Sequence, residues 1–123
     1  KYGYLFPSSS GFCSAVLTQR ISSRLSSFEF IISKQIVRSG TSIAANVAEA
    51  MFPQSDADFL SKMNIALKEA NETGYWLELL HRTEQISLDK YKELSNKCAS
   101  IRVMLIASCR TAKENTDKHT DVM

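Results

Sequence analysis

The sequence predicts an all-α fold, an antiparallel up-down four-helix bundle that forms one domain, because 123 residues with 44% hydrophobic content supply one ordinary core. Only four glycines and two prolines occur, so residues that interrupt helices or build turns are scarce. Apolar residues recur in steps of three and four, the period of a helix face. Short connections between these stretches favour antiparallel neighbours. The expected helices cover about 10–25, 30–51, 56–82 and 88–112, with a polar tail at 113–123.

The first helix is expected at about 10–25, although this region is rich in serine, a weak helix former. Eight serines lie between Ser8 and Ser27. The apolar residues nevertheless recur in steps of three and four: Cys13, Leu17, Ile21, Leu25 and Phe28.

The second helix, 30–51, has an apolar face built partly from small residues, which permits close helix packing. Its main seam contains Ile36, Gly40, Ile43, Val47 and Ala50. Gly40 costs about 1 kcal/mol relative to alanine inside a helix, which indicates either close backbone approach or a local distortion.

The third helix, 56–82, has the clearest pattern, a heptad seam sustained over about three repeats. The seam contains Phe59, Met63, Ala66, Ala70, Thr73, Leu77 and Leu80. Pro53 ends the preceding helix. Ser55 and Asp58 resemble a capping box with aspartate in place of glutamate.

The fourth helix, 88–112, repeats this spacing, with Ser87 as its expected N-cap. Its seam contains Tyr91, Leu94, Cys98, Ile101, Leu105 and Ser108. Beyond Ala112 the chain is polar, and we expect it to fray.

Several apolar residues of the third helix lie off its seam, although a bundle helix needs only one apolar stripe. They are Leu60, Ile65, Leu67, Tyr75, Trp76 and Leu79. Either this helix lies centrally and some of these residues cover loops, or a second apolar surface is buried by self-association. From the second alternative we predict a homo-oligomer with an interface at Leu67, Tyr75, Trp76 and Leu79.

The net charge of +2 is too small to imply nucleic-acid binding, but the charges are segregated along the chain. Five basic residues and one acidic residue precede Glu49, whereas the segment from Glu49 through Asp89 contains eight acidic and three basic residues. Six basic residues and one acidic residue follow, up to Lys113. Either helices of opposite charge attract each other, or a basic surface serves an anionic partner.

Candidate nucleic-acid-binding residues lie on the second and fourth helices. They are Lys34, Arg38, Lys90, Lys97 and Arg102. Because few aromatic residues are interleaved with them, base stacking has little support. The alternatives are a phosphate-contacting surface and an ordinary solvated helix face.

The sequence favours no enzymatic chemistry. Glu78 and His81 have the spacing of di-iron bundle ligands, but the only other histidine, His119, lies in the tail. No glycine-rich phosphate loop follows a strand, and no cysteine has a histidine base in a supporting motif. We therefore expect no catalytic residue, metal, cofactor or small-molecule substrate.

The expected location is the cytoplasm. Three cysteines without a Cys-x-x-Cys pair fit a reducing compartment. No stretch approaches the ~20 apolar residues of a membrane span. The N-terminus lacks a signal-peptide layout, so Lys1 is interpreted as a processing boundary.

Two long motifs carry a family resemblance. They are SKQIVRSGTSIAANVAEA at 33–50 and DFLSKMNIALKEANETGYWL at 58–77. Both resemble the bacterial four-helix bundle family first described from intervening sequences of large ribosomal RNA genes. The resemblance implies a cytoplasmic, ring-like homopentamer without known catalysis. It also implies a relation in fold to the accessory variability determinant of diversity-generating retroelements, which binds a reverse transcriptase and nucleic acid through a basic surface.

The resemblance assigns a structural role to the polar residues of both motifs. Those residues are Arg38, Ser42, Asn46 and Glu49 in the first motif, and Lys68, Glu69, Glu72 and Trp76 in the second. We expect them to hydrogen-bond across a helix–helix contact and fix its register. The expected function is a non-enzymatic oligomeric scaffold associated with RNA or with a nucleic-acid-processing protein. The alternative is a protein-binding adaptor whose charged faces serve only self-assembly.

Overall fold

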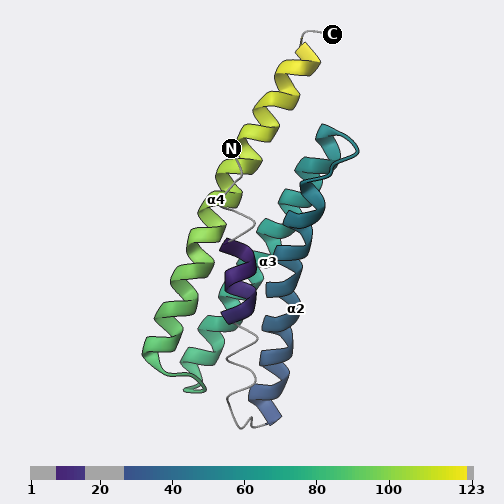
Figure 1. Cartoon of the computed structure of the whole chain (residues 1–123). Helices are drawn as coiled ribbons and strands as arrows, with labels where there is room; N and C mark the ends of the chain where they lie inside the picture. The colour runs from purple at the N-terminus through teal and green to yellow at the C-terminus, as the bar shows by residue number, and fades with distance from the viewer. Residues whose placement is uncertain (1–7, 16–26, 122–123) are drawn as a thin grey trace.

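The computed structural model describes residues 8–15 and 27–121, which form an all-α four-helix bundle without strands in these two ranges. Residues 8–15 are helical and are followed by α2 (Ser27–Ala50), α3 (Asp56–Arg82) and α4 (Leu88–Asp121). The three long helices run up, down and up in Figure 1. The predicted fold class is confirmed.

Helix α3 is the central member of the three long helices. It packs directly against both α2 and α4, whereas the backbones of α2 and α4 do not come close to each other within their described lengths. Residues 8–15 lie in front of α3 and between the other two helices in Figure 1. Phe12, which is 1% exposed, belongs to the same core as the side chains of the long helices. The first helix therefore closes the side of the core that α2 and α4 leave open.

The core is formed by the seams that the sequence pattern predicts. On α3 the buried residues are Met63, Ala66, Ala70, Thr73, Leu77 and Leu80. On α4 they are Leu94, Cys98, Ile101, Leu105, Ser108 and Ala112. Each set repeats in steps of three and four, so one stripe of each helix faces the core.

A small polar cluster interrupts this apolar core where α2 meets α3. Ser39 and Thr73 are fully buried, and their hydroxyl oxygens lie 2.7 Å apart. Thr73 Oγ1 also lies 2.8 Å from the carbonyl oxygen of Glu69. Because both hydroxyl groups have partners, their burial leaves no polar atom unsatisfied at this contact.

Gly40 lies under the ring of Phe12. A methyl group added at Gly40 would be 3.5 Å from Phe12 Cε1, which is ordinary van der Waals contact. The surrounding residues of α2 remain helical. The structure therefore shows no local distortion at this glycine, and the contact with Phe12 would also admit an alanine.

Helix α3 begins and ends at the predicted residues, 56 and 82. Ser55 Oγ accepts a hydrogen bond from the backbone N–H of Asp58 at 3.0 Å. The Asp58 carboxylate accepts one from the backbone N–H of Gln54 at 3.1 Å. These two hydrogen bonds resemble a capping box. The difference is that the carboxylate of Asp58 bonds to the residue before the N-cap, Gln54, and not to Ser55 itself.

A Schellman turn ends α3. The N–H groups of Gln85 and Glu84 donate to the carbonyl oxygens of Leu80 and His81, at 2.9 and 3.0 Å. Glu84 occupies the left-handed position, with φ of 59°, where glycine is usual. The turn reverses the chain so that α4 packs back along α3.

The other helix bounds differ from the prediction. Helix α2 begins at Ser27 and ends at Ala50, against 30–51. The first helix is already formed at residue 8, and the rest of its predicted range, 16–25, lies outside the described residues.

The prediction of a frayed tail from residue 113 is wrong, because α4 continues to Asp121. No glycine or proline stops it, and each further residue adds one backbone hydrogen bond to a helix that is already nucleated. The hydroxyl groups of Thr116 and Thr120 donate to the carbonyl oxygens four residues earlier, at 2.9 and 3.0 Å.

Candidate functional site

Arg38 on α2 is bound to two carboxylates of α3. Its guanidinium Nη1 lies 3.2 Å from Glu69 Oε2, and Nη2 contacts Glu72. The hydrogen bond with Glu72 raises the pKa of Arg38 and lowers the pKa of Glu72, against the effect of desolvation. Trp76 Nε1 donates to Glu72 Oε1 at 3.1 Å. This network joins the two sequence motifs across the α2–α3 contact.

Lys68, another polar residue of the motifs, is exposed and forms no salt bridge with a described residue, and the others divide into two groups. Glu49 Oε2 pairs with Lys62 Nζ across α2 and α3 at 2.7 Å. Asn46 Nδ2 instead donates to the carbonyl oxygen of Ser42 at 2.8 Å, within α2. The expectation of hydrogen bonds across the helix contact is therefore wrong for Ser42 and Asn46.

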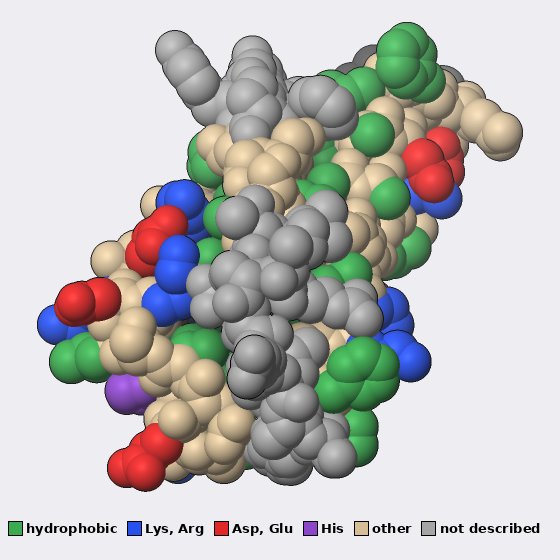
Figure 2. Space-filling model, turned by 60° about the horizontal axis from the view of Figure 1, so that its bottom comes forward, with side chains coloured by type: hydrophobic (Ala, Val, Ile, Leu, Met, Phe, Trp, Pro, Cys, Tyr) green, Lys and Arg blue, Asp and Glu red, His purple; other side chains and the backbone are tan. Residues whose placement is uncertain are grey.

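The five candidate nucleic-acid-binding residues are not gathered in one surface, because they lie on α2 and α4, two helices whose backbones do not come close to each other. Besides Arg38, Lys90 and Lys97 are engaged, since both pair with Glu93, at 3.1 and 3.4 Å. These two lysines lower the pKa of Glu93 by hydrogen bonding, with Lys90 the stronger influence. Basic and acidic side chains likewise alternate along one edge of the face shown in Figure 2.

Lys34 and Arg102 differ from the other three. Lys34 Nζ lies 5.4 Å above the centre of the Phe30 ring on the same helix. Arg102 is exposed and makes no salt bridge within the described ranges 8–15 and 27–121.

Arg102 belongs to a row of basic side chains along the outward side of α4. This α4 basic row consists of Lys92, Arg102, Arg110 and Lys113. All four are exposed, and none forms a salt bridge with any described residue. At 100° per residue they fall within one sector of the helix, and from Lys92 to Lys113 the row spans about 32 Å.

Of this row, only Arg102 is among the binding residues predicted from the sequence, and Lys92, Arg110 and Lys113 are not. A helical projection of 88–112 would have separated Lys92 and Arg110 from Lys90 and Lys97, which lie three residues before and four residues after Glu93. Lys113 was missed because it fell in the predicted tail.

The candidate oligomer-interface residues are used mainly within the chain. Leu67, Trp76 and Leu79 are partly buried against the core of their own bundle. Tyr75 is 57% exposed and meets the edge of the Trp76 ring, with 5.1 Å between centroids. The central position of α3 therefore explains why Leu67, Trp76 and Leu79 are apolar although they lie off the seam.

A groove of about 430 Å³ separates the outward sides of α3 and α4. Its α3 wall includes Asn71, Gly74 and Tyr75, and its α4 wall includes Ser95, Ala99 and Arg102. Cys98 lies at the floor, where its thiol donates to the carbonyl oxygen of Ala70 at 3.4 Å. Arg102 is therefore the member of the α4 basic row that lines this groove.

The thiols of Cys98 and Cys109 are poorly suited to nucleophilic chemistry. Burial raises the pKa of Cys98 to about 11, although the positive charge of Arg102 acts in the opposite direction. Burial also raises the pKa of Cys109. Both side chains therefore remain protonated thiols at neutral pH, whereas a cysteine nucleophile reacts as the thiolate.

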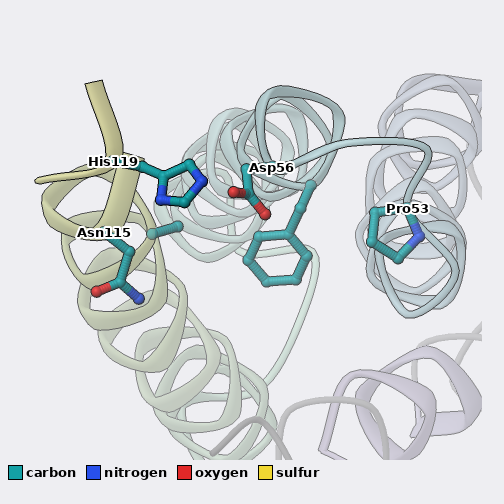
Figure 3. A pocket seen from close by; sticks show the side chains of 6 residues that line it. Pro53, Asp56, Asn115 and His119 are labelled. Carbon is teal, nitrogen blue, oxygen red and sulfur yellow. The ribbon is translucent and has the colours of Figure 1, made fainter. Parts of the chain in front are cut away.

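A second cavity, of about 410 Å³, lies where the start of α3 meets the end of α4. Figure 3 shows the imidazole of His119 pointing toward the carboxylate of Asp56, with Pro53 on the opposite side. Within the described ranges, no three His, Cys, Asp or Glu side chains are grouped to hold a metal ion. None of the described helices is long and apolar enough to cross a membrane.

Comparisons with known proteins agree with this fold. The family model described as "23S rRNA-intervening sequence protein" matches residues 10–107. A crystal structure from Bacteroides thetaiotaomicron is similar to the chain, with 45% identity and a TM-score of 0.82, and the match covers 88% of this chain and 96% of that one. That structure is described as a protein of unknown function from the S23 ribosomal protein family. The comparison with curated proteins finds no match.

Proposed function

Because the chain belongs to the 23S rRNA-intervening sequence protein family, we propose that it is a non-enzymatic, cytoplasmic, oligomeric scaffold that binds RNA. The observation that carries the proposal is the α4 basic row, whose four cations are exposed and free of carboxylate partners in the described part of the chain. Such cations can exchange their counterions for RNA phosphates without first breaking a salt bridge.

The contrast with the paired cations supports this choice of surface. Arg38, Lys90 and Lys97 already contact carboxylates, so binding a phosphate would cost them an existing interaction. The cations of the α4 basic row bear no such cost. Their span of about 32 Å is also long enough to follow several nucleotides of an RNA backbone.

A salt titration with purified protein and single-stranded RNA tests this function. We expect replacement of Lys92, Arg102, Arg110 and Lys113 by glutamine to lower affinity about 100-fold at low salt and to flatten the log–log salt slope by about 3. The matched control replaces Lys90 and Lys97 by glutamine, which also removes positive charge from α4 but should leave most of the affinity. Undetectable RNA binding by the unchanged protein at low salt would contradict the proposal.

Self-association is the second part of the proposal, and the family resemblance suggests five copies. Large apolar side chains on the described surface support it, since Ile31, Leu88 and Ile106 are 57%, 51% and 39% exposed. Sedimentation equilibrium should give about five times the chain mass of 13.8 kDa at micromolar concentration. A species of 13.8 kDa would exclude the oligomer.

The alternative function is a protein-binding adaptor whose charged faces serve only assembly. The salt bridges of Arg38 favour this alternative, because its guanidinium group is already used in the α2–α3 contact. An oligomer that forms normally but has no affinity for RNA would support this alternative.

A further inference from the structure

Two polar side chains of α3 line the groove toward α4 without a hydrogen-bond partner among the described residues, unlike the charged side chains that join α3 to α2. Elsewhere on this helix, Glu69 and Glu72 are bound to Arg38, and Lys62 is bound to Glu49. Asn71 and Tyr75, in contrast, form no side-chain hydrogen bond with any described residue. An amide and a phenol that face the same cavity are therefore both available to a ligand.

The α3 wall of the groove is open at Gly74. This residue lies in the middle of α3, where glycine is the weakest helix former apart from proline. A methyl group added there would meet no heavy atom within 4 Å, so packing within the chain does not explain the glycine. The small side chains of Ser95 and Ala99 line the opposite wall. The resulting space, about 430 Å³, is large enough for a planar ring system.

Charge favours a nucleotide over an uncharged ring. Arg102 lies at the cavity and close enough to Cys98 at its floor to act electrostatically on the thiol. The one carboxylate at the cavity, that of Glu78, is paired with Arg82 at 2.7 Å. An anionic group beside the ring would therefore be attracted by Arg102, while the Glu78–Arg82 pair would oppose it little.

We propose that this groove receives one unstacked nucleobase of single-stranded RNA, with Tyr75 stacking on the base, Asn71 hydrogen-bonding its edge and Arg102 contacting the adjacent phosphate. This inference rests on the proposed RNA-binding function and specifies how the RNA is read. Stacking on an exposed aromatic ring suits single strands, because the bases of a duplex are already stacked. The α4 basic row then guides the backbone to and from the groove.

Fluorescence anisotropy with labelled single-stranded RNA of about 12 nucleotides, and with a matched duplex, tests the groove. We expect Tyr75→Ala to lower single-strand affinity at least about 10-fold with an unchanged salt slope, and to leave duplex affinity unchanged. Tyr75→Phe, which keeps the ring, should retain most of the affinity. Arg102→Gln should instead reduce the salt slope by about 1.

A substitution that fills the groove tests whether RNA affinity can be lowered without destabilising the fold. Gly74→Leu places a better helix former where there is space for its Cβ, so the melting temperature should hold or rise while single-strand affinity falls. Gly74→Ala is the matched control of smaller volume. If Tyr75→Ala and Gly74→Leu both keep single-strand affinity within about twofold, the nucleobase site is wrong although RNA binding stands.

Two further outcomes distinguish the causes of failure. If the unchanged protein binds no RNA at low salt, the proposed function itself fails, and the nucleobase site fails with it. If Gly74→Leu dissociates the oligomer in sedimentation, the groove holds a second copy of the chain rather than a base, which overturns this inference but not the scaffold.

Discussion

Replacing Phe12 by alanine is expected to destabilise the protein by about 3–5 kcal/mol. The ring is 1% exposed, lies over Gly40 and belongs to the common core. Its loss would leave a cavity between residues 8–15 and the long helices. Urea unfolding followed by circular dichroism should show a lower midpoint with little change in slope.

The matched control for this substitution is Phe52→Ala. Phe52 is 88% exposed in the loop between α2 and α3, so its truncation removes little packing. We expect the free energy of unfolding to change by less than about 0.5 kcal/mol. A loss below about 1 kcal/mol for Phe12→Ala would contradict the docking of the first helix on the core.

Leu105→Ala is expected to cost about 2–5 kcal/mol, the range for truncating a fully buried leucine. Leu105 is 0% exposed on the core side of α4, so the surrounding helices cannot easily collapse into the space. Thermal unfolding by differential scanning calorimetry should show a melting temperature lower by roughly 10 °C or more.

Val103→Ala provides the comparison two residues away on the same helix. Val103 is 63% exposed, and alanine is the better helix former, so stability should be unchanged or slightly higher. Equal losses for the two variants would mean that α4 is rotated relative to the described packing.

Much of the fold was predictable because the pattern of α3 is strong. Its heptad seam is the buried stripe, and Ser55 and Asp58 cap its start as their spacing indicates. The end of α4 was not predictable from the same reasoning. The polar composition of 113–123 predicts a tail, whereas a nucleated helix continues through such residues, here to Asp121, when no glycine or proline intervenes.

The candidate site was less predictable, because the partner of each charge depends on how neighbouring helices are rotated. The pairing of Arg38 with Glu69 and Glu72 joins residues more than thirty positions apart, which periodicity within one helix cannot reveal. The pairing of Glu93 with Lys90 and Lys97 is local and could have been predicted. Neglecting it placed two salt-bridged lysines among the binding candidates.

The central position of α3 has a consequence for the route by which the chain folds. Each contact between long helices joins neighbours in the chain, α2 with α3 and α3 with α4, so these pairings close only short loops. Topologies of low contact order fold quickly, because little chain entropy is lost before the contacts form. The two helical hairpins share α3, and the formation of either one supplies a template on which the other assembles.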